Sequence, residues 1–472
     1  MVTTLQDTFK QNILNALEQA KKKNKSVLVS HVEKIQPIDP LQFYSQGEEA
    51  FLGERFFWKA PGHNLTIVGL GKEDKISTDD HTNNRFHYIE NIWKQLKESY
   101  INNINLDRSH QATGPILFGG FSFDPLKEKD QKWDTFSEAN LMLPKLMYTL
   151  EEGNGFLTIN QLVYPNDSFS HCIKHYDELK NYASVSGHFS CGFQEIEYRM
   201  EEKNTREWLD AIKQATKQIR RGEFNKVVLA REVSLSFNKT VDIYRVLASL
   251  IEEQTSSYIF SFEKGRQCFV GATPERLVKK EKDQLLSTCL AGSIKRGQTV
   301  KEDEQLGLEL LNDPKNLEEH AFVVKMISDA VSDCCETLDV PKEPALLKTK
   351  NIQHLYTPVK GKMKPGFSLW DLIEKLHPTP ALGGYPKEKA IEKIRELEPM
   401  HRGWYAGPIG WIDANDNGEF AVALRSGLIE DDQVSLYAGC GIVKDSVPER
   451  EYYETQIKLN PMLSALGGTI HE

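Results

Sequence analysis

Residues 208–237 read WLDAIKQATKQIRRGEFNKVVLAREVSLSF, and the hydrophobic period changes within them. Before Gly222 the apolar residues recur every three or four positions, which predicts an amphipathic helix that ends near this glycine. From Lys226 onward apolar residues alternate with others, which predicts a strand with one apolar face and Lys226 on the other. The helix face is Trp208, Ile212, Ala215 and Ile219, and the strand face is Val227, Leu229, Val233, Leu235 and Phe237.

Other predicted elements surround this unit without a strict alternation of strand and helix. Strands are predicted at residues 27–35, 65–71, 115–123 and 155–164, and a hairpin at residues 409–424, whose Asn417-Gly418 pair suits a tight turn. This mixture favours an α+β fold over a doubly wound sheet. The polar stretch near residues 164–204 is the best candidate boundary, which divides the chain into an N-terminal part, residues 1–195, and a C-terminal part, residues 196–472.

Composition and charge narrow the functional class. The chain has 472 residues and a net charge of −10, which argues against nucleic acid as a partner. No run approaches the ~18 apolar residues of a membrane span. The N-terminus predicts an amphipathic helix instead of a signal peptide, through Leu5, Phe9, Ile13 and Leu17. Seven cysteines without a C-x-x-C pair suggest neither disulfides nor zinc, so we expect a reducing, cytoplasmic location and no membrane.

A helix predicted over residues 315–338 carries a candidate site residue, Glu319. Its apolar residues form two stripes on opposite sides, so we expect a helix that is buried on both sides. A carboxylate at the end of a buried stripe must be paired, protonated or bound to a metal. One stripe is Leu317, Ala321, Val324 and Val331, and the other is Glu319, Val323, Met326 and Ala330.

The last predicted helix, residues 446–459, carries two further acids. Ser446 and Glu449 fit a capping box, and Pro448 fits the first turn. The residues that share one face are Glu451, Glu454 and Lys458. This arrangement fits either a surface ion-pair ladder or a carboxylate pair for a hard divalent cation.

Two glycines, Gly439 and Gly441, flank Cys440 just before this helix, where we predict a turn. The backbone N–H groups of such a turn suit a carboxylate, and a simple tight turn fits equally well.

Nine strings of the chain occur in the order in which chorismate-utilising enzymes carry them, and the chain resembles that family on this ground. They are FNKVVLARE, GATPERL, STCLAGSIKRG, KNLEEHAFVVKMI, IQHLYTP, LHPTPALGGYPKEKA, RGWYAGPIGW, FAVALRSGLI and AGCGIVKDSVPEREYYETQIKL. The resemblance is strongest to the isochorismate synthases, and the long N-terminal part resembles their menaquinone-pathway form. It implies an α+β fold in which two mixed, largely antiparallel sheets form a sandwich with helices outside.

The resemblance also implies roles for individual residues. Lys226 resembles the lysine that activates water, and Glu275 the general acid at the leaving hydroxyl. Glu319 and Glu454 resemble the two magnesium ligands, and Glu451 a supporting acid.

The remaining matches line the substrate pocket. Groups that resemble holders of the substrate carboxylates are Tyr405, Arg425, Lys458 and the backbone of Gly441, and Gly292, Ser293 and His354 line the same pocket in relatives. Asn316 departs from the pattern, because some relatives carry an acid there.

Three positions indicate that water, not ammonia, is the nucleophile. Amine-transferring relatives usually carry glutamine at the position of Lys226, and some carry a nucleophilic lysine in the string that reads CLAGS here, from Cys289 to Ser293. Ala381 stands where these relatives usually place threonine. We therefore expect no glutamine amidotransferase subunit.

The implied reaction is the reversible, Mg²⁺-dependent conversion of chorismate into isochorismate. Lys226 would take a proton from the water that attacks carbon 2, and Glu275 would protonate the departing 4-hydroxyl. A salicylate synthase, which uses the same pocket and then eliminates pyruvate, is one alternative. A non-catalytic chorismate sensor is another, but it would be expected to lose one of Lys226, Glu275, Glu319 and Glu454, which are all present.

Overall fold

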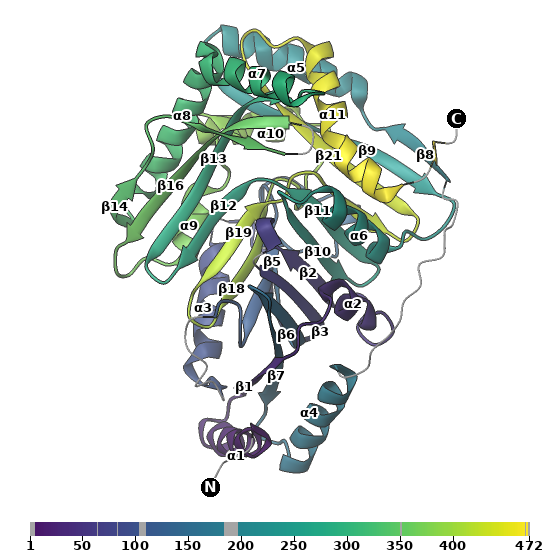
Figure 1. Cartoon of the computed structure of the whole chain (residues 1–472), viewed down its shortest axis with the longest axis vertical. Coiled ribbons are helices and arrows are strands. Elements are labelled where there is room, and N and C mark those ends of the chain that lie inside the picture. Colours follow the sequence, from purple (N-terminus) through teal and green to yellow (C-terminus); the bar gives the residue numbers. More distant parts are fainter. Residues whose placement is uncertain are drawn as a thin grey trace.

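The structure is a computed structural model and describes residues 5–63, 65–82, 84–102, 110–183, 197–349, 352–467 and 469–470. The fold is α+β, as predicted, and its strands form two arms that meet at one long strand, β6. In the view of Figure 1, α1 and α4 lie at the lower end, and α5, α7, α8 and α11 lie at the upper end.

The first arm runs through strands from both parts of the sequence. Its order is β1 (Val27–Ile35), β7 (Asn154–Val163), β6 (Ala139–Glu151), β3 (Leu65–Thr78), β2 (Arg55–Lys59), β10 (Tyr258–Lys264), β11 (Gln267–Thr273), β20 (Ser426–Glu430), β21 (Gln433–Ile442), β9 (Lys226–Phe237) and β8 (Glu197–Glu202). All of these pairs are antiparallel. Three short strands extend the edges, namely β4 (Ile101–Asn102) and β22 (Thr469–Ile470), both parallel to their neighbours, and β17 (Gly384–Tyr385).

The second arm leaves β6 at residues 139–142, on the edge whose other end pairs with β7, and is entirely antiparallel. Its order is β5 (Ile116–Phe121), β18 (Pro408–Asp413), β19 (Gly418–Val422), β12 (Arg276–Glu281), β13 (Gln284–Lys295) and β16 (Ile352–Met363), with β14 (Cys335–Asp339) and β15 (Ala345–Lys348) on the outer edge of β16. The predicted hairpin is β18–β19, whose turn is held by Asp413 as its Oδ1 accepts from the N–H of Asn417 at 2.9 Å.

The main core lies where the two arms face each other. Phe56 of β2 stacks on Phe118 of β5 with ring centroids 4.3 Å apart, and Phe262 of β10 lies 5.3 Å from Trp404. A second core lies on the opposite face of the first arm, under α1, α2, α4, α6 and α11. The predicted two-sheet sandwich is therefore confirmed.

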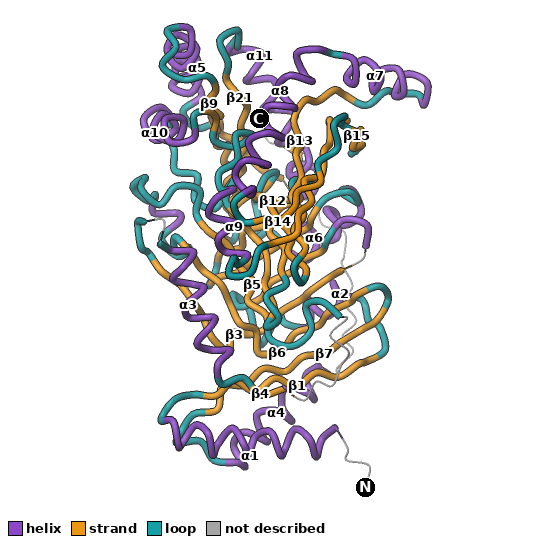
Figure 2. Tube along the Cα trace, turned by 90° about the vertical axis from the view of Figure 1, so that its left-hand side faces the viewer, coloured by secondary structure: helices purple, strands orange, loops and turns teal. Residues whose placement is uncertain are grey.

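The helices cover the outer faces of the sandwich (Figures 1 and 2). Those over the second core are α1 (Leu5–Lys23), α2 (Pro40–Gln46), α4 (Phe169–Ala183), α6 (Ile243–Glu253) and α11 (Pro448–Leu466). The others are α3 (Arg85–Glu98), which packs on α9 (Leu369–Leu376), α5 (Thr205–Arg220) and α10 (Lys387–Leu397) beside β9, and α7 (Val300–Asn312) and α8 (Pro314–Ser332) beside β13. Short 3-10 turns occur at Pro61–His63 and Gln131–Trp133.

The C-terminal end of the helix predicted at residues 315–338 was wrong. α8 stops at Ser332, and Cys335–Asp339 forms β14 on the edge of β16. Strand pairing at the edge of the sheet overrides the helical pattern there, because a strand satisfies backbone groups that a frayed helix end leaves open.

The apolar faces predicted for the two helices α5 and α1 agree with the structure. The helix face of α5 and the side chains of Phe9, Ile13 and Leu17 in α1 are buried, whereas the side chain of Leu5 lies outside the described residues. Six cysteines are free and buried, and Cys191 lies outside the described residues. Among the helices described, none is both long and apolar enough to cross a membrane.

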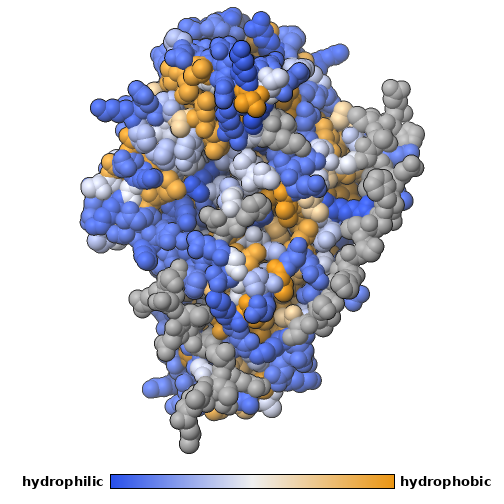
Figure 3. Space-filling view, viewed as in Figure 1, coloured by the Kyte–Doolittle hydropathy of each residue, from blue (hydrophilic) through white to orange (hydrophobic). Residues whose placement is uncertain are grey.

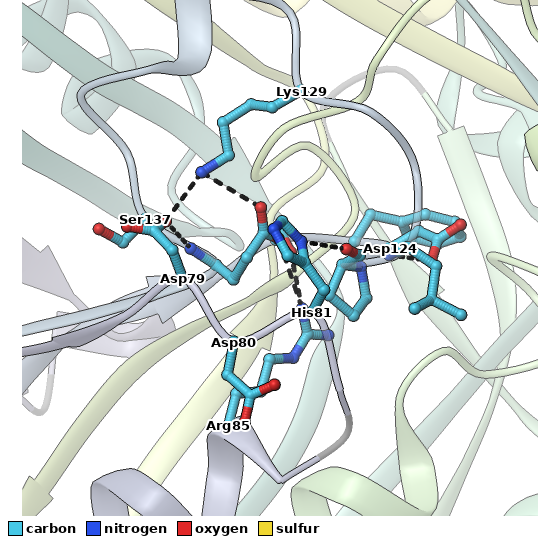
Figure 4. Close-up of polar contacts among 12 residues, drawn as sticks. Asp79, Asp80, His81, Arg85, Asp124, Lys129 and Ser137 are labelled. Carbon is cyan, nitrogen blue, oxygen red and sulfur yellow. Dashed lines mark hydrogen bonds and ion pairs between the residues drawn. The ribbon is translucent and has the colours of Figure 1, made fainter.

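The two parts of the sequence are joined by hydrogen bonds as well as by the core. The labelled residues of the polar cluster in Figure 4 belong to the N-terminal part, where Lys129 donates to Asp79 at 2.9 Å and lies 3.2 Å from Glu138. Asp124, in the same cluster, accepts two bonds from Arg395 of α10, at 2.9 and 3.0 Å. The predicted division between residues 195 and 196 falls at the edge of residues 184–196, outside the described residues, and stays a prediction.

Candidate active site

Lys226 and Glu319 meet at the centre of the candidate site. Lys226 is the first residue of β9, and Glu319 lies in the second turn of α8. Lys226 Nζ donates to Glu319 Oε1 at 2.7 Å, and the two side chains are 17% and 40% exposed. The pair therefore faces an open space and is not sealed in the core.

The expectation that α8 is buried on both sides was wrong. One face alone is buried, formed by His320, Val323, Ile327 and Val331, while Ala321 is exposed. The buried face takes Val323 from one predicted stripe and Val331 from the other, since a helix at the edge of a sandwich needs one apolar face only. Glu319 is nevertheless paired, as a carboxylate in this position was expected to be.

The predicted turn at Gly439–Gly441 was also wrong, because these residues continue β21. Gly439 pairs with Ala230 and Gly441 with Val228 in an antiparallel ladder. A Cβ on Gly441 would lie 2.8 Å from Lys226 Cε and 3.4 Å from its Nζ. The glycine therefore provides the space that the Lys226 side chain occupies, a role that glycine often has in a strand.

Replacing Gly441 with alanine is expected to lower activity about tenfold or more while folding stability stays near that of the wild type. Among the described residues beyond its chain neighbours, the atoms within 4 Å of the new methyl group belong to the flexible end of Lys226, which has to move. Gly439→Ala is the matched control, because its methyl group would press on Leu229 and Ala230 and not on Lys226. Measured kcat/KM values and melting temperatures check this; unchanged kcat/KM in Gly441→Ala would contradict it.

Helix α11 packs against β21 and brings Glu451, Glu454 and Lys458 to the same region. The predicted capping box is wrong, because α11 begins at Pro448 and the hydroxyl of Ser446 accepts instead from the N–H of Val443 at 3.1 Å.

Lys458 ties this face of α11 to the strand. Lys458 Nζ lies 2.7 Å from Glu454 Oε1 and donates to the carbonyl of Gly439 at 2.9 Å. Burial raises the pKa of Glu451, and the negative charge of Glu454 raises it further. Two carboxylates that repel each other beside a lysine form a site where an added cation would be stabilised.

Glu275 is the most deeply buried acid among the predicted site residues, with 8% of its surface exposed. It follows β11, and its backbone carbonyl accepts from Val422 at 3.0 Å. Burial raises the pKa of Glu275 to about 7, although the positive charges of Lys458 and Lys226 act against the shift. A carboxyl group with such a pKa is still protonated near neutral pH and can donate a proton.

His354 and Ser293 form another wall of the site. Ser293 lies on β13 beyond a β-bulge that contains Gly292, and its hydroxyl is 2.7 Å from His354 Nδ1. Burial lowers the pKa of His354 to about 3, with the charges of Arg425 and Lys458 contributing. The imidazole is therefore neutral, and its buried Nε2 has no hydrogen-bond partner among the described residues.

Arg425 and Tyr405 are the last two of the predicted site residues. Arg425 adopts a left-handed backbone with φ of 46°, a conformation that costs about 1–3 kcal/mol and is concentrated at functional sites. Burial lowers the pKa of Arg425, and within the described ranges no carboxylate pairs with it. Tyr405 is buried and stacks on Tyr437 at 5.5 Å, and the charge of Glu275 helps to raise its pKa. Arg425 is thus free to take an anionic ligand.

The structure brings all twelve predicted site residues into one connected region around the end of β21. The list is Lys226, Glu275, Gly292, Ser293, Glu319, His354, Tyr405, Arg425, Gly441, Glu451, Glu454 and Lys458. Lys226 and Lys458 connect most of them, since both act electrostatically on Glu275.

The sequence reasoning missed a buried ion pair that holds β9 from behind. Arg402 Nε donates to Glu398 Oε2 at 2.9 Å, and the same two side chains bond the backbone of β9, at Val228 O (2.8 Å) and Ala230 N (2.7 Å). The pair fixes the strand that begins with Lys226. Its sequence signal was the i, i+4 spacing of an acid and an arginine, which alone does not distinguish a buried pair from a surface one.

A separate cavity of about 640 Å³ opens between the end of α6 and the end of β13, and no predicted site residue lines it. Its two cations, Arg296 and Lys348, already pair with Asp303, at 2.6 and 2.8 Å. The cluster of charged side chains around Lys226 is therefore the candidate active site.

Comparison with known proteins identifies the class of protein that carries this site. Residues 15–467 match the family described as chorismate binding enzyme, and the chain belongs to that family. It is 48% identical over 471 residues to the isochorismate synthase MenF of Bacillus subtilis, with 99% of both chains covered. It is 34% identical over 470 residues to the salicylate biosynthesis isochorismate synthase of Pseudomonas aeruginosa, which covers 98% of this chain and 95% of that one.

The fold comparison agrees. The structure of MenF, the menaquinone-specific isochorismate synthase from Escherichia coli, matches 97% of this chain and 100% of that chain with a TM-score of 0.77 and 26% identity.

Proposed function

We propose that the protein is an isochorismate synthase, an isomerase of the hydroxyl-transferring kind, that acts in menaquinone biosynthesis. The observation that carries the proposal is the placement of Lys226 and Glu275 in one site, where burial raises the pKa of Glu275 to about 7. The relatives whose names contain this activity cover almost the whole chain. We further propose a cytoplasmic location, because the six described cysteines are free.

Each catalytic residue has one proton to move. Lys226, when neutral, takes a proton from a water molecule as its oxygen bonds to carbon 2 of chorismate. The ring double bonds shift, and the bond from carbon 4 to its hydroxyl breaks as Glu275 gives that oxygen a proton. One water enters and one leaves, so substrate and product are isomers.

The remaining residues bind and orient the dianionic substrate. Arg425 presents a planar guanidinium that suits a carboxylate, and burial raises the pKa of Tyr405, so that its hydroxyl stays neutral and can donate a hydrogen bond. His354 and Ser293 form a neutral wall, and Nε2 of His354 is available for a hydrogen bond with the substrate. Because the product differs only in the position of one hydroxyl, we expect the same product ratio, near unity, from either direction.

Magnesium is proposed as the cofactor, held by Glu319 and Glu454 with Glu451 in support. No three His, Cys, Asp or Glu side chains of the described residues converge as a ready metal site. The donors nevertheless fit, because Glu319 and Glu454 each form an ion pair with a lysine. Burial raises the pKa of Glu451 and the charge of Glu454 raises it further, so a cation beside them would be stabilised. When bound, a magnesium ion would neutralise a substrate carboxylate, since it prefers oxygen ligands and keeps several waters. Asn316 offers an amide in place of an acid.

Replacing Glu319 with glutamine is expected to raise the magnesium concentration needed for half-maximal activity about tenfold or more, because a neutral amide is a weaker ligand for a hard cation. Titration of activity with Mg²⁺ measures this. Glu318→Gln, one residue away and exposed, is the matched control. An unchanged magnesium requirement in Glu319→Gln would remove this residue from the proposed metal site.

The test of the function is product analysis. Purified protein is incubated with chorismate, with and without Mg²⁺, and the products are separated by chromatography. We expect isochorismate, formed only with Mg²⁺, and no need for glutamine or an amidotransferase subunit. Salicylate with pyruvate would support the salicylate synthase alternative, and chorismate binding without turnover would support a sensor.

A further inference from the structure

A β-bulge interrupts β13 beside the candidate site. The register passes from Leu290 opposite Tyr356 to Ser293 opposite His354, so that two residues, Ala291 and Gly292, face one residue of β16. Gly292 has φ of +79°, and a Cβ there would lie 3.2 Å from Asn316 Oδ1. The bulge therefore turns the strand so that Ser293 and His354 can meet, and it removes Ala291 from the regular ladder.

His320 of α8 supplies the hydrogen bond that the bulged strand lacks. Its Nδ1 lies 3.0 Å from the carbonyl oxygen of Ala291, and its Nε2 lies 2.8 Å from Thr357 Oγ1 on β16. A carbonyl oxygen can only accept, so Nδ1 carries the hydrogen and Nε2 accepts from the threonine hydroxyl. The imidazole is 2% exposed and joins one helix to two strands.

This imidazole lies behind two walls of the site at once. It is the neighbour in sequence of Glu319, which pairs with Lys226 at 2.7 Å. Its partner Ala291 is two residues from Ser293, which bonds His354 at 2.7 Å. One side chain thus connects the wall that carries Glu319 to the wall that carries Ser293. Displacements of about 1 Å in such a constellation cost large factors in rate.

We propose that His320 is a positioning residue, which sets the distance between Glu319 and the Ser293–His354 wall through its bond to the bulged carbonyl of Ala291. It touches neither substrate nor reacting atoms. The inference rests on the proposed function, in that these two walls bind chorismate.

Two variants separate the two hydrogen bonds of His320. In His320→Asn the amide nitrogen takes the place of Nδ1, so the bond to Ala291 can persist. In His320→Gln the amide takes the place of Nε2, so the contact with Thr357 can persist while Ala291 loses its donor. Both variants lose the ring and replace it with an amide, which makes each the control for the other.

The measurements are KM and kcat for chorismate, calorimetric binding of chorismate without Mg²⁺, and the melting temperature. We expect His320→Gln to weaken binding and raise KM about tenfold or more, and His320→Asn to stay within about threefold of the wild type, at similar melting temperatures. Equal behaviour of the two variants, a larger loss in His320→Asn, or losses that only follow the melting temperature would overturn the proposal. A wild type that binds chorismate without forming isochorismate would refute the proposed function, and the binding comparison would still test the role of His320.

Discussion

Replacing Lys226 with alanine is expected to lower kcat by about 10² to 10⁴-fold while chorismate still binds, because general-base catalysis contributes factors of this size. Lys226 is placed for the task. It begins a strand that Arg402 and Glu398 hold from behind, and Gly441 leaves the space that its side chain fills. Single-turnover rates and calorimetric binding of chorismate measure the two effects separately.

Two variants serve as comparisons for Lys226→Ala. Lys226→Gln keeps a long side chain and introduces the residue that is usual in amine-transferring relatives. With water as the nucleophile, we expect this variant to be as inactive as Lys226→Ala. Lys213→Ala removes an exposed lysine of α5 and should change nothing. Near-complete activity in Lys226→Ala would mean that the base lies elsewhere.

Replacing Glu275 with glutamine is expected to have two opposite effects. Activity should fall by about 10² to 10⁴-fold, because an amide cannot give a proton to the departing hydroxyl. Stability at alkaline pH should rise. Burial holds the pKa of Glu275 at about 7 in the folded state, against an ordinary value of 4.5. In the window between these values the unfolded chain releases the proton and the folded chain keeps it, so stability falls as pH rises.

The size of the stability effect follows from the same shift. One pKa unit corresponds to about 1.4 kcal/mol, so the free energy of unfolding of Glu275→Gln relative to the wild type should increase by about 2 kcal/mol between pH 5 and pH 8. Denaturant titrations at the two pH values measure it. In the wild type, kcat/KM should also decline above about pH 7 as Glu275 loses its proton. A difference in stability that does not change with pH would show that Glu275 is not protonated in the folded enzyme.

The elements of this fold could be predicted from the sequence wherever one face of an element is apolar. The helix with Trp208 and the strand from Lys226 to Phe237 lie where their hydrophobic periods place them. Errors arose where a backbone partner far along the chain decided the conformation. Gly441 lies in a strand because β9 pairs with it, and Ser446 caps no helix because its hydroxyl accepts from Val443.

The candidate site could be listed from motifs but not assembled from them. Lys226 and Glu319 are 93 positions apart, and nothing local to either residue indicates that they form an ion pair at 2.7 Å. The raised pKa of Glu275 depends on burial by elements that surround it in space. The role of His320 was missed because the sequence does not show that its partner, the carbonyl of Ala291 in the β-bulge, lies beside it.

The origin of the new hydroxyl tests the central claim, attack by water at carbon 2, most directly. Chorismate is incubated with the enzyme and Mg²⁺ in water enriched in oxygen-18, for a single turnover, and the isochorismate is analysed by mass spectrometry. We expect one labelled oxygen, in the hydroxyl on carbon 2. Unlabelled isochorismate would mean that the original hydroxyl moves from carbon 4 to carbon 2, and the roles assigned to Lys226 and Glu275 would be contradicted.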